Sequence, residues 1–236
     1  MSHSAPAGAG PTLTSYDPAP RRQTVTLDLE TLSWGEQYKL LIGTVIPRPI
    51  ALVTTLGPAG PNAAPFSFFN GIGVDPMMLI ISIGPTVGPK KGTDKDTITN
   101  LRALPEFVVH IVDDASKEKM NICSAEYPHG VDESALAGFR TEPSRFVRPP
   151  RIADCPVQFE CKVAEILTLG RTPFNLVIGE VLCIHYHEGI VDTDMHVDVD
   201  RLNTIGRLAG NGVYSRITDR FTMPAPPPPP PTHSKV

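Results

Sequence analysis

The pattern of apolar and polar positions predicts a chain built mainly of β-strands. Residues 50–56, "IALVTTL", are apolar and β-branched on both faces, which is typical of a strand buried on both sides. A turn-forming "GPAGPN" follows, and residues 62–70 and 77–84 are then expected to form the second and third strands. Further strands are predicted in "FVVHIVD", "VQFECKVAEILTLG" and "NLVIGEVLCIHYHEGIV".

Three short helices fit between these strands. The first is expected to begin near Asp96 as its N-cap and to end at Leu104, before Pro105. The other two cover residues 115–123 and 133–137. Many strands with few helices, and no alternation of strand and helix, predict a mainly β protein in the form of a β-barrel. A doubly wound sheet is not favoured, because neither GxGxxG nor GxxxxGK[ST] occurs.

The composition predicts one folded domain between two disordered tails. Of the 236 residues 41% are hydrophobic, which is enough for a sizeable core. Residues 1–22 are mostly small residues and proline, so that ordering them would bury little apolar surface. Residues 224–236 are proline-rich and predict a solvated polyproline II tail; a ligand for SH3 or WW modules is the alternative. The folded domain is therefore expected over residues 23–223.

The charge and the cysteines limit the partners and the compartment. A net charge of −4 provides no basic surface for nucleic acid, and no apolar run approaches the roughly 18 residues of a membrane span. The four cysteines form no CxxC pair and no zinc-type spacing. We therefore expect free thiols and a cytoplasmic protein, without a nucleic acid or membrane partner.

Two stretches are candidates for binding an anion. Arg48 lies between two prolines, and a guanidinium held in place suits a phosphate or a carboxylate, although a surface arginine at a strand entry is an equal alternative. Thr54 and Thr55 follow on the same strand. In "KKGTDKDTITN", Lys95 and Thr97 lie at a predicted helix N-terminus, where backbone N–H groups and the helix dipole favour an anion. The alternative there is a solvated lysine loop.

A third stretch, residues 62–79, combines aromatic and hydrogen-bonding side chains. Three phenylalanines, among them Phe69, stand beside Ser67 and Asn70 in "NAAPFSFFNGIGVDPMML". Rings favour an apolar setting, whereas serine and asparagine in such a setting need hydrogen-bond partners. A flat ligand with an apolar body and a polar edge would satisfy both requirements.

Other chemistry has less support in the sequence. His185 and His187 share one face of a strand, and His196, Asp198 and Asp200 do so if their segment is extended, but solvent-facing alternation is favoured over a metal site. We find no nucleophilic triad and no pair of catalytic carboxylates, and expect neither a metal nor a catalytic residue.

These motifs, in this order, resemble the flavin reductase-like family. The resemblance rests on "PRPIALVTT", "NAAPFSFFNGIGVDPMMLIIS", "KDTITNLRALPEFVVHIV", "SRFVRPPRIADCPVQFECKVAEI" and "RLNTIGRLAGNGVYSRITDRF", and spans about residues 40–221. It implies an FMN-binding split β-barrel of the group that carries a PRP motif.

The resemblance also implies roles for individual residues. Ser67 and Asn70 would hold the polar edge and ribityl chain of FMN, while Arg48, Lys95 and Thr97 would hold its phosphate.

The covering of the flavin ring is less well defined by the resemblance. Phe174 would cover the ring from a second subunit. Some relatives have a tryptophan where this chain has Leu52, which leaves the stacking partner open. Trp34 is a substitute for it, although a place in the core is the favoured interpretation.

The resemblance implies the activity of an FMN-dependent oxidoreductase, and it implies that the protein is a homodimer. NAD(P)H would supply hydride, and a flavin, a small molecule or a partner protein would receive the electrons. Two alternatives are an FMN-holding electron carrier without a nicotinamide site and a flavin-binding or dimerising scaffold without turnover.

Overall fold

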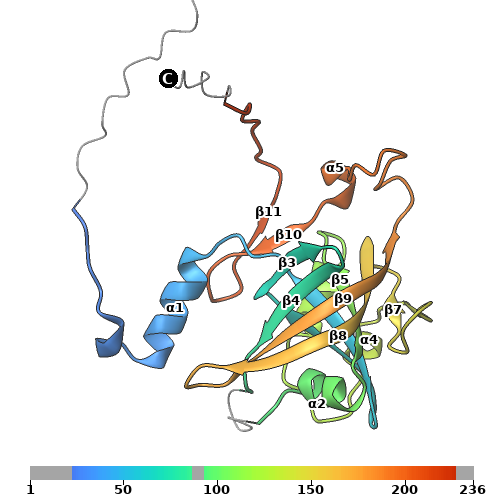
Figure 1. The fold of residues 1–236 in the computed structure, drawn as a ribbon, viewed down its shortest axis with the longest axis horizontal. Coiled ribbons are helices and arrows are strands. Elements are labelled where there is room, and N and C mark those ends of the chain that lie inside the picture. Colours follow the sequence, from blue (N-terminus) through green and yellow to red (C-terminus); the bar gives the residue numbers. More distant parts are fainter. Residues whose placement is uncertain (1–22, 87–92, 227–236) are drawn as a thin grey trace, which may run out of the picture.

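One antiparallel sheet of seven strands forms the body of the protein (Figure 1). The computed structural model describes residues 23–86 and 93–226. The order across the sheet is β2-β1-β5-β8-β9-β4-β3. The strands are β1 (Ala51–Gly57), β2 (Gly60–Phe66), β3 (Phe69–Val74), β4 (Met77–Ile83), β5 (Glu106–Ile111), β8 (Val157–Leu169) and β9 (Phe174–Tyr186). The prediction of a mainly β split barrel is confirmed. The predicted tails fall outside the described residues, apart from residues 224–226.

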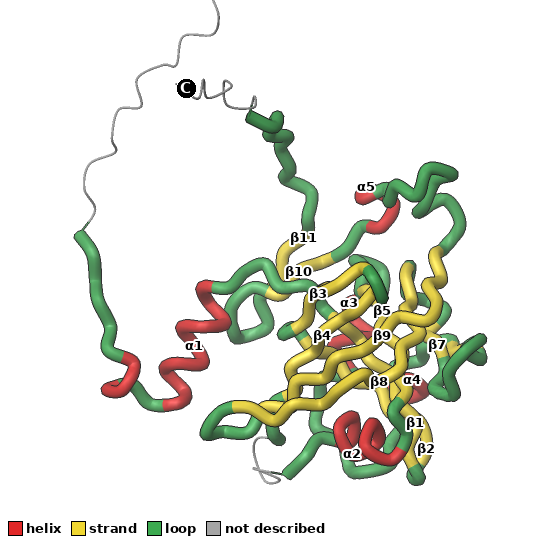
Figure 2. The backbone as a smooth tube through the Cα atoms, in the orientation of Figure 1, coloured by secondary structure: helices red, strands yellow, loops and turns green. Residues whose placement is uncertain are grey.

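Short helices and two small strand pairs surround this sheet (Figure 2). They are η1 (Leu29–Thr31), α1 (Trp34–Thr44), α2 (Asp96–Ala103), α3 (Lys117–Ile122), α4 (Glu133–Leu136) and α5 (Val199–Leu202), and the pairs β6 (Thr141–Glu142) with β7 (Arg151–Ile152) and β10 (Ile205–Arg207) with β11 (Tyr214–Arg216). The three predicted helices correspond to α2, α3 and α4, although the N-cap of α2 is Lys95 and not Asp96. None of the described helices is long and apolar enough to cross a membrane.

Helix α1 was not predicted, although the sequence carries its start signal. The Ser33 hydroxyl accepts a hydrogen bond from the Glu36 backbone N–H at 3.4 Å, and the Glu36 carboxylate accepts one from the Ser33 N–H at 2.8 Å. Such a capping box satisfies the free N–H groups at a helix N-terminus. Its serine and glutamate, three residues apart, therefore identify the beginning of α1.

The strand predicted over residues 62–70 is in fact two strands. β2 ends at Phe66 and β3 begins at Phe69, and these two strands form opposite edges of the sheet. One continuous strand cannot lie at both edges, so the chain bends at Ser67 and Phe68. The bend places the most aromatic stretch of the sequence at the opening of the barrel.

The interior of the barrel depends on a close fit between β5 and β9. Phe107 on β5 is fully buried, and its ring lies over Gly179 on β9. A Cβ atom at Gly179 would lie 2.3 Å from Phe107 Cζ, so only glycine leaves room for the ring. Phe107 belongs to the first cluster of buried hydrophobic side chains. A second hydrophobic cluster includes Leu52, Met120 and Ile152.

His110 joins the large sheet to β7, and it is held as a neutral imidazole. Its Nδ1 lies 2.8 Å from the Leu52 carbonyl oxygen, and its Nε2 accepts a hydrogen bond from the Ile152 N–H at 2.8 Å. One nitrogen therefore donates and the other accepts. Burial lowers the pKa of His110 from 6.5 to about 4.

We expect the folded state to lose stability through His110 as the pH falls below 6.5. Between pH 6.5 and about pH 4, His110 binds a proton in the unfolded chain but not in the folded chain. This difference lowers the free energy of unfolding by about 2 kcal/mol at pH 5. Urea unfolding at pH 7 and pH 5 measures this loss. His110→Gln should be less stable at both pH values but should show a smaller fall between them. An equal fall in both proteins would contradict the assignment.

Candidate functional site

A cavity of about 800 Å³ opens where β2 passes into β3. Helix α1, the end of β4 with the segment after it, the start of α2 and the β8–β9 turn form its other walls. The side chains that matter for its chemistry are Trp34, Tyr38, Phe66, Ser67, Phe68, Lys95, Arg171 and Phe174. The volume lies within the range of small-molecule sites, and the bend at Ser67 and Phe68 creates the opening.

Four aromatic rings follow one another along this cavity. Trp34 stacks on Tyr38 with 5.2 Å between ring centroids and 8° between planes. The ring centroids of Tyr38 and Phe68 are 6.4 Å apart, and those of Phe68 and Phe174 are 6.3 Å apart. Trp34 is 47% exposed, so the favoured interpretation of a core tryptophan is wrong. The row forms an apolar wall for a flat ligand.

Phe174 reaches this wall from its own chain. Its ring lies against Phe68 and over Gly84, where a Cβ atom would come within 2.7 Å of Phe174 Cε1. The sequence prediction placed Phe174 over the ring of a partner subunit. The structure gives it a place in the cavity of the same chain.

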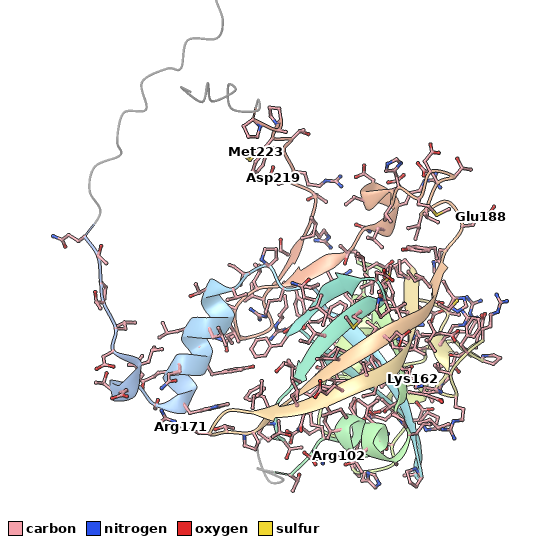
Figure 3. All side chains as sticks on the ribbon, viewed as in Figure 1. Arg102, Lys162, Arg171, Glu188, Asp219 and Met223 are labelled. Carbon is pink, nitrogen blue, oxygen red and sulfur yellow. The ribbon has the colours of Figure 1, made fainter. Side chains whose placement is uncertain are left out.

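A positive charge lines the same cavity as the aromatic row. Lys95 is the N-cap of α2, and its Nζ lies 6.0 Å from the centroid of the Phe66 ring. Within residues 23–86 and 93–226 no side chain caps this helix end, so backbone N–H groups and the positive end of the dipole are available to an anion. Arg171, at the tip of the β8–β9 turn, lines the same cavity and was missed by the sequence analysis (Figure 3).

Thr55 and Thr97 come together in a buried network beneath α2. The Thr97 hydroxyl donates to Asn62 Oδ1 at 3.1 Å, and Asn100 Nδ2 donates to Thr55 Oγ1 at 3.0 Å. Asn62 Nδ2 lies 3.0 and 2.9 Å from the two carboxylate oxygens of Glu133. Burial raises the pKa of Glu133. The hydroxyl hydrogen of Thr97 is therefore used inside the protein, and the network supports the helix start that carries Lys95.

Three other predicted site residues lie outside the lining of this cavity. The buried Thr54 hydroxyl donates to the Pro150 carbonyl oxygen at 2.6 Å. Phe69 packs against the barrel core. Asn70 is exposed, and its side-chain oxygen accepts a hydrogen bond from the Gly71 N–H at 2.9 Å. Their predicted contacts to a cofactor stay predictions.

Arg48 is buried, and its guanidinium binds backbone carbonyl groups. Nη1 donates to Ile42 O at 2.5 Å and to Val45 O at 2.9 Å, while Nη2 donates to Leu208 O at 2.6 Å. Nε donates to the Ser67 hydroxyl at 3.3 Å. These bonds tie the end of α1 and the segment after β10 to the bend between β2 and β3. The phosphate contact predicted for Arg48 stays a prediction, but most donors of the side chain already have partners.

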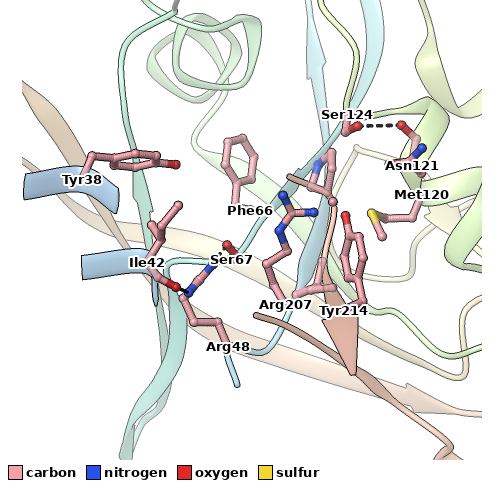
Figure 4. A pocket seen from close by; sticks show the side chains of 13 residues that line it. Tyr38, Ile42, Arg48, Phe66, Ser67, Met120, Asn121, Ser124, Arg207 and Tyr214 are labelled. Carbon is pink, nitrogen blue, oxygen red and sulfur yellow. Dashed lines mark hydrogen bonds between the residues drawn. The ribbon is translucent and has the colours of Figure 1, made fainter. Parts of the chain in front are cut away.

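A second cavity of about 490 Å³ shares Pro65, Phe66 and Ser67 with the first (Figure 4). Its walls include Arg207 and Tyr214, from β10 and β11, whose side chains the sequence analysis did not single out. Both lie in "RLNTIGRLAGNGVYSR", at the end of the stretch that carries the family resemblance.

The histidine and cysteine side chains are used in packing and hydrogen bonding. His185 Nε2 lies 2.7 Å from the buried carboxylate of Glu160 and His187 Nε2 lies 2.8 Å from the Ala153 carbonyl oxygen. Asp198 caps α5, so the segment around it is not extended as assumed. All four cysteines are free, as predicted.

The buried thiols are poor nucleophiles. Burial raises the pKa of Cys123 to about 12 and the pKa values of Cys155 and Cys161 further. A thiol is nucleophilic as its thiolate, so burial makes these groups unreactive.

The barrel, its bend and the cavity lined by aromatic and cationic side chains define a split-barrel protein. Residues 42–204 match the family described as Flavin reductase like domain, and the chain belongs to this family.

Relatives cover most of the chain. It is 39% identical over 203 residues, 84% of this chain and 97% of the relative, to the uncharacterized protein YwrF of Bacillus subtilis. The crystal structure of Pseudomonas fluorescens 2-nitrobenzoate 2-nitroreductase NbaA is 34% identical, with a TM-score of 0.78, over 88% of this chain and 100% of that chain. Nitrilotriacetate monooxygenase component B from Bacillus cereus is 29% identical, with a TM-score of 0.81, over 86% of this chain and 100% of that chain.

Proposed function

We propose that the protein binds FMN and acts as an oxidoreductase that takes hydride from NAD(P)H and passes electrons to a flavin, a small molecule or a partner protein. The observation that carries this proposal is one cavity lined both by a row of aromatic rings and by Lys95, the N-cap of α2. A flat ring system with a phosphate on a flexible chain would match both features. FMN would supply the redox chemistry, and the protein supplies its placement.

The residues of the cavity have distinct roles in this proposal. Phe68 and Phe174 pack against the flavin ring, and Lys95 binds the phosphate with the backbone N–H groups of α2. Ser67 accepts its hydrogen bond from Arg48, so its own hydroxyl hydrogen is available to a polar atom at the edge of the ring. The charge of Lys95 makes the protein bind FMN more tightly than riboflavin, which lacks the phosphate.

Two titrations test the proposal. FMN added to flavin-free protein should bind near one per chain and more tightly than riboflavin. NADH or NADPH added without oxygen should then bleach the flavin absorbance. Uptake of FMN without bleaching would favour an electron carrier, and failure to take up FMN would favour a scaffold. Because one relative is named a 2-nitrobenzoate 2-nitroreductase, a small aromatic acceptor is the first to test for turnover.

We also propose that the protein is a homodimer. Helix α1 and the segment after it expose apolar side chains, with Leu41 51%, Val45 54% and Ile46 46% exposed, and Val74 on the edge strand β3 is 88% exposed. Exposed apolar surface of this kind favours association. Sedimentation at micromolar concentration should show a mass of about twice the 25.5 kDa of one chain. A species of 25.5 kDa that still holds FMN would overturn this proposal.

A further inference from the structure

The second cavity lies directly beside the proposed flavin site. It shares Tyr38 and the stretch Pro65, Phe66 and Ser67 with the first cavity, and it continues to Arg207 and Tyr214. Figure 4 shows Arg207 and Tyr214 on one side of it and Tyr38 on the other. A ligand in this second cavity would lie next to whatever occupies the first.

Arg207 brings a positive charge to this cavity, and no described residue forms an ion pair with it. Its guanidinium carbon lies 4.5 Å from the centroid of the Tyr214 ring, and the side chain is half-buried. Within residues 23–86 and 93–226 the guanidinium has no hydrogen bond and no ion pair, and the cavity lining holds no carboxylate. The charge of Arg207 also contributes, after burial, to lowering the pKa of Arg48. Two cationic groups therefore face one cavity without an anion.

The two arginines differ in what they can offer a ligand. Most N–H groups of Arg48 point to backbone carbonyls, whereas those of Arg207 have no hydrogen-bond partner among the described residues. A guanidinium packed with its carbon over an aromatic ring still has N–H groups at its edge for two oxygens of a carboxylate. Tyr38, Phe66 and Tyr214 add aromatic surface around this position.

We propose that the second cavity binds a small aromatic carboxylate beside the flavin and that Arg207 is the residue that selects the carboxylate. A volume of about 490 Å³ suits a ligand of this size. The proposal rests on the proposed function for its redox meaning, because a ligand placed here would be the electron acceptor. The charge recognition itself depends only on Arg207 and the aromatic walls.

Benzoate and its neutral isostere benzamide test the proposal in calorimetric titrations of the FMN-loaded protein. Benzoate should bind at least tenfold more tightly, and benzamide binding too weak to measure counts as the same result. Arg207→Gln should weaken benzoate binding at least tenfold and leave the affinity for FMN unchanged. Arg207→Lys keeps the charge without the paired donors and should keep part of the affinity for benzoate.

Arg145→Gln is the matched control, because Arg145 also lies over an aromatic ring, 5.1 Å from the centroid of Phe146, but outside both cavities. It should change neither affinity. Equal binding of benzoate and benzamide, no benzoate binding, or a loss on Arg207→Gln that falls on FMN or NADH instead of benzoate would overturn the proposal. The benzoate and benzamide titrations are repeated without FMN. If the protein takes up no FMN, the proposed function fails. The difference between benzoate and benzamide affinity in the FMN-free protein still tests the role of Arg207.

Discussion

Lys95→Glu is expected to weaken FMN binding more than tenfold and to leave riboflavin binding almost unchanged. A charge-assisted hydrogen bond contributes roughly 1.5–3 kcal/mol, which corresponds to a factor of about 10 to 150 in affinity. The substitution removes the cation at the N-cap of α2 and places a carboxylate where the phosphate is expected. Because riboflavin lacks the phosphate, only FMN should be affected. Fluorescence titration of both flavins gives the two affinities.

A control on the outer side of the barrel separates this local effect from a change of net charge. Lys162 on β8 is exposed and far from the cavity lining (Figure 3). Lys162→Glu should leave both affinities as they are in the wild type. The effect of Lys95→Glu should also decrease as salt rises, since Lys95 is accessible to solvent. If Lys95→Glu weakened both flavins equally, the phosphate assignment would be wrong and the damage structural.

Arg48→Met is expected to lower the free energy of unfolding by about 3 kcal/mol and to change the ratio of FMN to riboflavin affinity little. The substitution keeps most of the length of the side chain but leaves the carbonyl oxygens of Ile42, Val45 and Leu208 without their donor. Buried acceptors without partners each cost about 1–3 kcal/mol, part of which relaxation and water recover. Urea unfolding measures the loss.

If Arg48 binds the FMN phosphate, as predicted from the sequence, the opposite result is expected. If the guanidinium held the phosphate, Arg48→Met would reduce FMN affinity much more than riboflavin affinity and would cost little stability. Arg145→Met serves as the control for loss of an exposed arginine, and it should change the free energy of unfolding by less than about 0.5 kcal/mol. A stable Arg48→Met protein with selective loss of FMN affinity would show that the carbonyl contacts contribute little.

Patterns that repeat along the chain were sufficient to predict the fold. The apolar runs over β1, β4, β5, β8 and β9 each belong to a buried or half-buried strand, and hydrophobic periodicity reports burial directly. The family followed from several motifs in a consistent order. Lys95 was predicted to lie at a helix N-terminus, and this is a local property that depends on neighbouring residues alone.

Local signals did not reveal where the second strand breaks. Residues 62–70 have the composition of one strand, but β2 and β3 pair with β1 and β4 at opposite edges of the sheet. Which edges a segment pairs with depends on the order of all the strands. The bend at Ser67 and Phe68, and the cavity that it opens, are therefore products of the tertiary structure.

The partners of the charged side chains were also decided by the tertiary structure. The prolines around Arg48 indicated a fixed position, whereas its acceptors include Leu208, 160 residues away. Arg207 carried no signal of its own, because a free guanidinium becomes informative only when the groups around it are known. By itself the sequence determined most strands of the large sheet, the family and the cationic start of α2. Only the fold decided which cations are already bound to protein oxygens and which are free to bind a ligand, since hydrogen bonds between distant segments exist only after the chain has folded.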